Sequence, residues 1–318
     1  MTTNRGFQNV WWLAFGTIIL VLGVSLLSEL LPENWCGEFG SSVIGEFMII
    51  LPCIAGIFLI EKKYKGEQNW REYIGVKKFK PILIPLLIFL PMAAQYFAVF
   101  VSMYATTFSY FLFGTPDQGD ILPKTTLGTV QMIFSLCVLA PVLEELLCRG
   151  IIMKMLEKYG IAAEILVSAI IFAMLHVSAQ SMIAIFFIGM LFGAVKKVTG
   201  SIIPGMIMHC VNNGMSFAMT AVTENNTVPQ TVFVVWAAVL VATFPFMIVG
   251  FLKIYKDVDT HSFIFTPKMK KGLSVGLILS IAVCVVFNLM VIAVRIKSGE
   301  LTTPFEDFAA QIQSFVLP

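Results

Sequence analysis

The chain has 318 residues, of which 58% are hydrophobic and only 13% are charged. A soluble globular domain carries roughly 25% charged and 45–50% apolar residues, so the composition excludes an ordinary soluble protein. The formal net charge of +2 is too small to indicate a nucleic-acid-binding surface, and we expect no nucleic-acid partner.

Apolar runs of about 20 residues recur along the chain, and this is the length that an α-helix needs to cross a bilayer. We expect one all-α membrane domain over residues 1–318, with the lipid bilayer as its surroundings. It should be a polytopic bundle of about eight or nine transmembrane helices with a buried polar cavity. The oligomeric state is unknown from sequence. In chain order the runs are 10–31, 41–60, 81–113, 126–157, 161–178, 181–195, 203–221, 231–254 and 273–295.

Basic residues in the connections predict the orientation, because cytoplasmic loops are enriched in lysine and arginine. The connection 61–80 holds seven of them and is expected to be cytoplasmic. If all nine runs cross, the other basic connections fall on the same side and the acidic ones on the opposite side. We therefore expect a multi-pass protein of the cell membrane with a cytoplasmic N-terminus. The short runs 161–178 and 181–195 form either two crossings or a tight hairpin.

Ionisable groups at membrane depth cost several kcal/mol each and usually mark function. At 1.5 Å per residue, four polar side chains lie roughly 10 to 20 Å from the cytoplasmic ends of their runs. They come from three different runs, yet fall in about one layer, as a shared site requires. These four are Glu144, His176, His209 and Asn213. Glu46 and Glu164 lie nearer the expected interfaces, where we expect them to be solvated or to snorkel toward the headgroups, and His261 lies in a connection; we assign them no role.

Spacing places His209 and Asn213 on one face of a helix, because they are four residues apart. Asn212 is three residues from His209 and is also a neighbour on that face. Spacing alone therefore does not choose between the two amides.

Glu145 and Arg149 are also four residues apart and can form an ion pair. Glu144 points about 100° away from Glu145, so one carboxylate can be held while the other faces a different space. The alternative is a purely structural pair between Glu144 and Arg149. Pro141 is expected to interrupt the helix just before these residues and to free backbone groups there.

Three motifs in order carry a family resemblance. The stretch APVLEELLCRG from Ala140 to Gly150 resembles the EExxxR motif of the CAAX-type intramembrane peptidases, the CPBP or Abi family, which includes Rce-type prenyl endopeptidases. The segment from Phe172 to His176 resembles the family's FxxxH motif, and the segment from His209 to Asn213 its HxxxN motif. All three lie within 126–221, which we take as the catalytic core.

The resemblance implies an intramembrane endopeptidase that hydrolyses a peptide bond of a membrane-associated or lipidated peptide or protein. A carboxylate and preorganised donors in a water-poor cavity suit this chemistry. By the resemblance, Glu144 and His176 activate a water, His209 and Asn213 stabilise the tetrahedral oxyanion, and Glu145 and Arg149 have a supporting, positioning role.

Three alternatives stay open. Zinc could be held by Glu144, His176 and His209, since two histidines and a glutamate suit it; but the sequence lacks HExxH, and we expect no cofactor. A proton-coupled transporter also uses buried Glu and His, although no repeated halves are present. A non-catalytic membrane scaffold is the third. The cleavage sequence and the biological role are not indicated.

Overall fold

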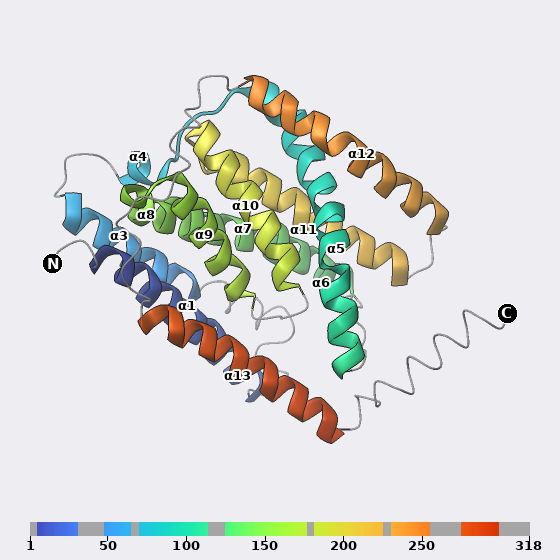
Figure 1. The fold of residues 1–318 in the computed structure, drawn as a ribbon, viewed down its shortest axis with the longest axis horizontal. Coiled ribbons are helices and arrows are strands. Elements are labelled where there is room, and N and C mark those ends of the chain that lie inside the picture. The colour runs from blue at the N-terminus through green and yellow to red at the C-terminus, as the bar shows by residue number, and fades with distance from the viewer. Residues whose placement is uncertain are drawn as a thin grey trace.

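The computed structural model describes residues 5–30, 48–64, 70–113, 125–176, 181–224, 230–254 and 275–298. Every regular element in these ranges is helical, so the all-α prediction is confirmed for them. The α-helices are α1 (Arg5–Leu30), α3 (Ile50–Tyr64), α4 (Trp70–Ile74), α5 (Ile84–Phe113), α6 (Thr126–Phe134), α7 (Ala140–Glu145), α8 (Met153–Leu156), α9 (Ile161–Leu175), α10 (Met182–Thr199), α11 (Ile203–Glu224), α12 (Gln230–Ile254) and α13 (Val275–Ser298), as Figure 1 shows.

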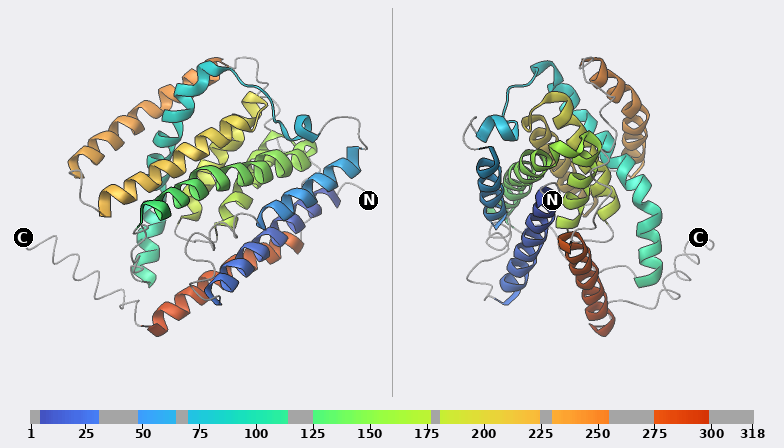
Figure 2. Two further views of the ribbon diagram at one scale, coloured as in Figure 1. Left: turned by 180° about the vertical axis from the view of Figure 1, so that it is seen from behind. Right: turned by 60° about the vertical axis from the view of Figure 1, so that its left-hand side comes forward.

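One long helix, Thr126–Tyr159, carries the EExxxR residues, and we call it the motif helix. It consists of α6, α7 and α8, joined by two π-helical segments, Ser135–Leu139 and Leu146–Ile152, and it ends in the 3₁₀ turn Glu157–Tyr159. In the left view of Figure 2 it runs through the middle of the molecule, with α1, α3 and α13 on one side and α11 and α12 on the other.

The prediction that Pro141 interrupts the helix is wrong, because the motif helix continues through it. The first π-helical segment widens the turn just before the proline, and the N–H of Ala140 donates to the carbonyl of Ser135, five residues back. Single wide turns of this kind are frequent at functional sites. The widening lets the chain accommodate the proline without leaving the helix.

Several helices have the length and apolar composition of membrane spans. Within the described residues, 5 helices contain such a stretch, and shorter apolar helices occupy three further segments. These features are those of a multi-pass membrane protein, while the expectation of eight or nine crossings stays a prediction. The long stretches are Phe7–Val24, Pro81–Ala98, Thr126–Tyr159, Met182–Thr199 and Val234–Phe251, and the shorter helices are Ile50–Glu61, Ile161–Leu175 and Gly276–Val286.

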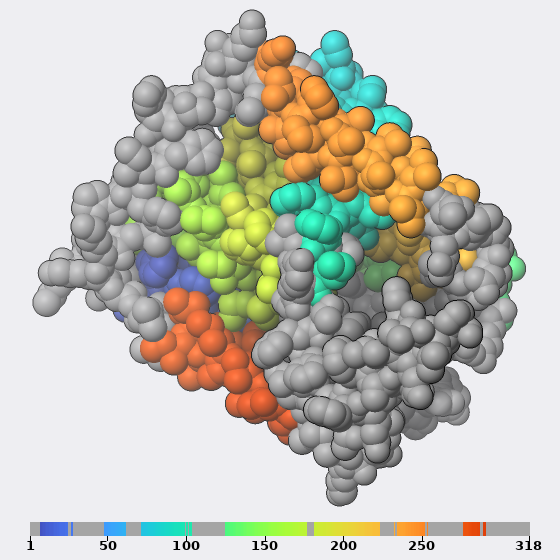
Figure 3. Space-filling model, turned by 45° about the vertical axis from the view of Figure 1, so that its right-hand side comes forward, coloured from blue at the N-terminus to red at the C-terminus, as the bar shows by residue number. Residues whose placement is uncertain are grey.

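The outermost helices present apolar side chains to the surroundings. On the face seen in Figure 3, α12 and α13 lie at the surface with parts of α9 and α10 between them. Val234 and Phe246 of α12 and Met290 of α13 are exposed. A surface of this kind suits the hydrocarbon of a bilayer, because helices satisfy their backbone groups internally and need no water.

The interior is divided into two hydrophobic cores. The first core includes Trp11, Ile151 and Phe172 and joins α1, α3, the motif helix, α9 and α13. The second includes Leu87 and Phe192 and joins α5, α10, α11 and α12. The rings of Phe172 and Phe192 meet with centroids 6.5 Å apart. This contact marks the junction of the two cores, where the candidate site lies.

The described basic segments around Lys77, Lys154 and Lys197 are joined by contacts at one end of the bundle. Gly200, with φ of 68°, ends α10 in the left-handed region that glycine adopts readily. In the turn that follows, the hydroxyl of Ser201 donates to the carbonyl of Lys77 at 2.6 Å. The ammonium of Lys154 lies 5.1 Å from the centre of the Tyr73 ring. These contacts agree with the predicted alternation of basic connections, and the assignment of this end to the cytoplasm stays a prediction.

The prediction of a solvated Glu164 is wrong. Its side chain is buried, and the ammonium of Lys197 donates to both carboxylate oxygens at 2.9 and 3.0 Å. The close packing of α9 against α10 brings the two residues together. Glu46 and His261 lie outside the described residues.

Candidate active site

His209 of α11 stands at the junction of the two cores, between two aromatic rings. The centroid of its ring is 5.4 Å from that of Phe172 and 5.3 Å from that of Phe192. The guanidinium carbon of Arg149 lies over the same two rings, at 4.3 and 5.4 Å from their centres. His209 and Arg149 are both buried. One pair of aromatic side chains therefore holds an imidazole and a guanidinium in place, as cation–π contacts do.

The ion pair that spacing predicted between Glu145 and Arg149 is present. Their Oε1 and Nη1 atoms are 2.7 Å apart, and both side chains are fully buried. A second guanidinium nitrogen, Nη2, donates to the carbonyl of Gly189 in α10 at 2.9 Å. Arg149 thus links the motif helix to α10 while it neutralises one of the two adjacent glutamates.

The close approach of α11 to Glu145 depends on a glycine. A Cβ atom at Gly205 would lie 2.6 Å from Oε2 of Glu145, which is closer than real Cβ contacts come. Gly205 therefore leaves the space that the carboxylate occupies. Neither its place in the first turn of α11 nor its residue type signals this role in the sequence.

His209 reaches both neighbouring carboxylates. Its Nε2 lies 3.7 Å from Oε2 of Glu144, and its Nδ1 lies 3.4 Å from Oε1 of Glu145. These distances are longer than most hydrogen bonds. The buried Oε2 of Glu144 has no hydrogen-bond partner among the described residues. The two glutamates therefore occupy different environments, one paired with Arg149 and the other with its Oε2 nearest to the His209 ring.

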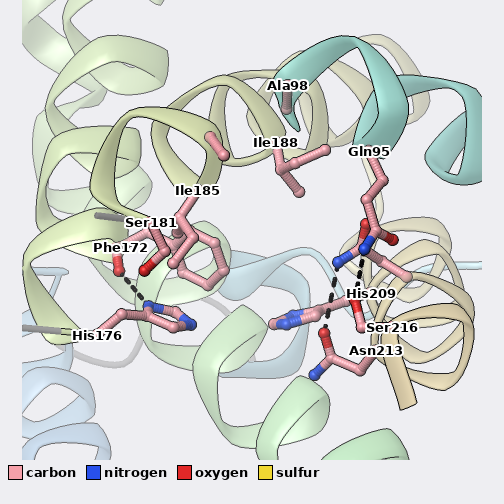
Figure 4. Close-up of a pocket in the computed structure, with 12 residues that line it drawn as sticks. Gln95, Ala98, Phe172, His176, Ser181, Ile185, Ile188, His209, Asn213 and Ser216 are labelled. Atoms are coloured by element: carbon pink, nitrogen blue, oxygen red, sulfur yellow. Dashed lines mark hydrogen bonds between the residues drawn. The ribbon is translucent and has the colours of Figure 1, made fainter. Parts of the chain in front are cut away.

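His176 follows the last turn of α9, and a backbone contact orients its ring. Its Nδ1 lies 2.8 Å from the carbonyl oxygen of Phe172. Because a carbonyl only accepts, we assign the proton to Nδ1, which leaves Nε2 as an acceptor in the neutral ring. Figure 4 shows the rings of His176 and His209 facing each other across a pocket.

The pocket has a volume of about 310 Å³ and lies between α5, α9, α10 and α11. This is the size of a small-ligand pocket. Figure 4 shows the two histidines and Asn213 on one side, apolar side chains of α5 and α10 opposite, and Gln95 with Ser216 at one end. Its lining residues are Gln95, Ala98, Phe172, His176, Ser181, Ala184, Ile185, Ile188, His209, Asn212, Asn213 and Ser216.

The structure thus brings three of the four expected catalytic residues to one pocket. Glu144 is not among the lining residues, but its Oε2 lies 3.7 Å from Nε2 of His209, which does line the pocket. Sequence reasoning missed Gln95 and Ser216. Gln95 had a signal, because it is a polar residue in the middle of the apolar run 81–113, and Ser216 is seven residues after His209 on the same helix face.

Asn213 forms a hydrogen bond with the motif helix. Its Nδ2 donates to the carbonyl oxygen of Leu136 at 2.8 Å. Leu136 lies five residues before Pro141, and the π-helical spacing seen at Ala140 would direct an N–H at position 141 to this same carbonyl. Proline has no such N–H, so the amide of Asn213 supplies the missing donor. Oδ1 of Asn213 accepts from Nδ2 of Asn212 at 3.5 Å.

Glu144, His176 and His209 are the zinc ligands of the alternative mechanism. In the part of the chain that the structure describes, no group of three His, Cys, Asp or Glu side chains is arranged so that it could hold a metal ion. Glu144, His176 and His209 do not meet that requirement in this arrangement. We therefore derive no step of the reaction through a metal.

Comparison with known protein families gives a match to part of the chain. Residues 126–215 match the family model described as type II CAAX prenyl endopeptidase Rce1-like. No curated protein and no solved structure matches the chain. The matched segment contains all three motifs, and the match confirms the family resemblance that they carry.

Proposed function

We propose, from the match of residues 126–215 to the type II CAAX prenyl endopeptidase Rce1-like family, that this protein is an intramembrane endopeptidase. It hydrolyses a peptide bond of a membrane-associated or lipidated peptide. A peptide with a prenylated cysteine near its C-terminus is the substrate class that the family's description suggests. The observation that carries the proposal is the buried Glu144 carboxylate, 3.7 Å from His209 beside the pocket that His176 also lines.

In the proposed reaction Glu144 and His176 activate a water. Nε2 of His176 accepts a hydrogen bond from the water, because its Nδ1 is held by the Phe172 carbonyl. Oε2 of Glu144 accepts a proton as the water oxygen attacks the peptide carbonyl carbon. The same proton then moves to the departing amine nitrogen when the C–N bond breaks. Glu144 therefore ends the cycle as it began, as a carboxylate.

His209 and Asn213 are the proposed donors to the oxyanion of the tetrahedral intermediate. One N–H of the Asn213 amide is used at Leu136, which fixes the side chain, and the second is proposed for the oxyanion. Donors that are already oriented stabilise such an intermediate without reorganisation. Glu145 and Arg149 keep a positioning role, since Glu145 lies 3.4 Å from Nδ1 of His209.

The test uses purified protein in proteoliposomes and a farnesylated peptide that ends in three residues after the modified cysteine. Release of the C-terminal tripeptide is followed by mass spectrometry. Glu144→Gln should slow release by about 100-fold or more. Glu157→Gln is the matched control, since this glutamate lies on the same helix but is half exposed and pairs with Lys154.

Equal release by the wild-type protein and Glu144→Gln would contradict the proposal. Proton-driven flux into the proteoliposomes that requires Glu144, without peptide cleavage, would instead favour the transporter. A cellular phenotype that survives both Glu144→Gln and His176→Ala would favour the scaffold.

A further inference from the structure

One end of the pocket carries two amide oxygens that the proposed reaction does not use. They are Oε1 of Gln95 in α5 and Oδ1 of Asn212 in α11. Both atoms are buried, and among the described residues neither has a hydrogen-bond partner. A buried acceptor without a donor is unfavourable, so two of them in one pocket indicate a ligand that supplies donors.

The nitrogen of each amide has a hydrogen-bond acceptor in the structure. Nε2 of Gln95 donates to the hydroxyl oxygen of Ser216 at 2.5 Å. Nδ2 of Asn212 donates to Oδ1 of Asn213, whose own Nδ2 is held by the Leu136 carbonyl. Because each nitrogen already has an acceptor, the oxygen is the atom left open in each amide. For Asn212 the bonds decide which end of the amide is free, because Asn213 is itself oriented by the Leu136 carbonyl; for Gln95 the free oxygen is that of the observed orientation, in which the Ser216 hydroxyl accepts.

The open oxygens lie along the same face of α11 as His209. Asn212 and Ser216 are three and seven residues after His209, which corresponds to about 4.5 and 10.5 Å along the helix. An extended peptide advances about 3.3 Å per residue. A peptide with its scissile carbonyl near His209 therefore places the backbone of its next one to three residues beside Asn212 and Gln95.

We propose that Gln95 and Asn212 form a backbone-binding subsite for the substrate peptide. Their amide oxygens accept hydrogen bonds from N–H groups of the substrate, while Ala98, Ile185 and Ile188 on the facing wall contact an apolar side chain. This subsite rests on the proposed peptidase function and names how the substrate is held. Since both open atoms are acceptors, the subsite takes internal amides of the peptide and not its terminal carboxylate.

The test measures binding separately from cleavage. The Glu144→Gln protein is titrated with the farnesylated peptide and with analogues in which one backbone N–H at a time is replaced by an ester oxygen. Binding is followed by fluorescence anisotropy. We expect at least one ester analogue to bind about tenfold more weakly than the parent peptide. Adding Gln95→Met should weaken the parent by a similar factor and abolish the difference between the parent and the analogue whose replaced N–H donates to Gln95.

Gln131→Met is the matched control, because Gln131 lies on α6 and does not line the pocket; it should leave the ester effect unchanged. Ser216→Ala is a second, milder variant that removes the partner orienting Gln95 and should reduce the ester effect. The subsite would be overturned if every ester effect persisted in both Gln95→Met and Ser216→Ala, so that none depended on Gln95. The absence of any ester effect or of any peptide binding would overturn it as well.

The outcomes separate the subsite from the peptidase function. Cleavage by wild-type protein together with an ester effect that survives Gln95→Met leaves the peptidase and removes the subsite. A Gln95-dependent ester effect without cleavage by wild-type protein leaves the subsite and removes hydrolysis.

Discussion

The side-chain amide of Asn213 in α11 donates a hydrogen bond to the backbone carbonyl of Leu136 in the motif helix. This carbonyl is the one that the ring of Pro141 leaves without a backbone donor in the π-helical register. A residue expected from its motif to serve the reaction therefore also completes the backbone of a neighbouring helix. The two roles of Asn213 can be separated by restoring the backbone donor.

Pro141→Ala provides that separation. Asn213→Ala alone should lower the free energy of unfolding by about 1 kcal/mol, because the Leu136 carbonyl loses its donor. In the Pro141→Ala background the same change should matter less, since the N–H of residue 141 can reach that carbonyl. Activity should fall in both backgrounds if Asn213 also serves the oxyanion. Denaturant unfolding of the wild type, the two single variants and the double variant gives a double-mutant cycle. An equal stability loss from Asn213→Ala in both backgrounds would contradict this account.

Replacing Glu145 should mainly lower the stability of the protein, whereas replacing Glu144 should mainly lower its activity. Glu145→Gln leaves the fully buried Arg149 without its counter-charge and should destabilise the protein by roughly 3–5 kcal/mol. Glu144→Gln should abolish activity with little loss of stability, because the structure describes no ion pair between Glu144 and Arg149. Thermal unfolding in detergent measures the stability of both variants, and peptide cleavage measures their activity. A loss for Glu144→Gln as large as that for Glu145→Gln would show that the two carboxylates share one structural role.

Gly205→Ala should disturb the site without replacing any charged residue. The new methyl group would lie 2.6 Å from Oε2 of Glu145, so either the carboxylate or α11 must shift. We expect peptidase activity to fall at least about tenfold, because a displacement near 1 Å strongly affects catalysis. Gly214→Ala on the same helix is the control. Its methyl group would meet only Sγ of Cys137 at 3.7 Å, an ordinary contact, and full activity is expected.

Chelation tests the metal-free mechanism. Protein dialysed against EDTA should keep its peptidase activity, and elemental analysis of the active protein should show less than stoichiometric zinc. The physical reason is that activation of the water is assigned to Glu144 and His176 rather than to a metal. Inactivation by EDTA followed by recovery on adding zinc would establish the alternative with Glu144, His176 and His209 as ligands.

The positions of the helices could be predicted from hydropathy alone. Within the described residues each of the nine apolar runs contains a helix or several consecutive helical segments, although residues 41–47 of the run 41–60 lie outside them. The short helix α4 lies in a connection that hydropathy did not mark. The helix in the run 161–178, α9, ends at Leu175, and the helix in the run 181–195, α10, extends to Thr199. Hydropathy succeeds here because a segment in lipid must satisfy its own backbone groups, and a helix does so locally. It gives no information about tilt or neighbours.

The finer geometry of the site depends on packing that the sequence pattern does not encode. Spacing predicted the pair of Glu145 with Arg149, because that contact is local. The placement of Phe192 beside His209, and of Gln95 beside Ser216, depends on how α10 and α5 pack against α11. Pro141 was misjudged for the same reason. Its usual effect is local, whereas here a π-helical turn and a side chain from another helix compensate for it.

The pairing of Glu145 with Arg149 within a single helical segment bears on how the chain is inserted during synthesis. The motif helix leaves the ribosome before α11, so His209 is absent when the two charges first meet lipid. Because they neutralise each other one turn apart, the segment carries no net charge from this pair into the hydrocarbon. Insertion of the motif helix is thus independent of α11, whereas assembly of the hydrolytic centre must wait for α11 to arrive.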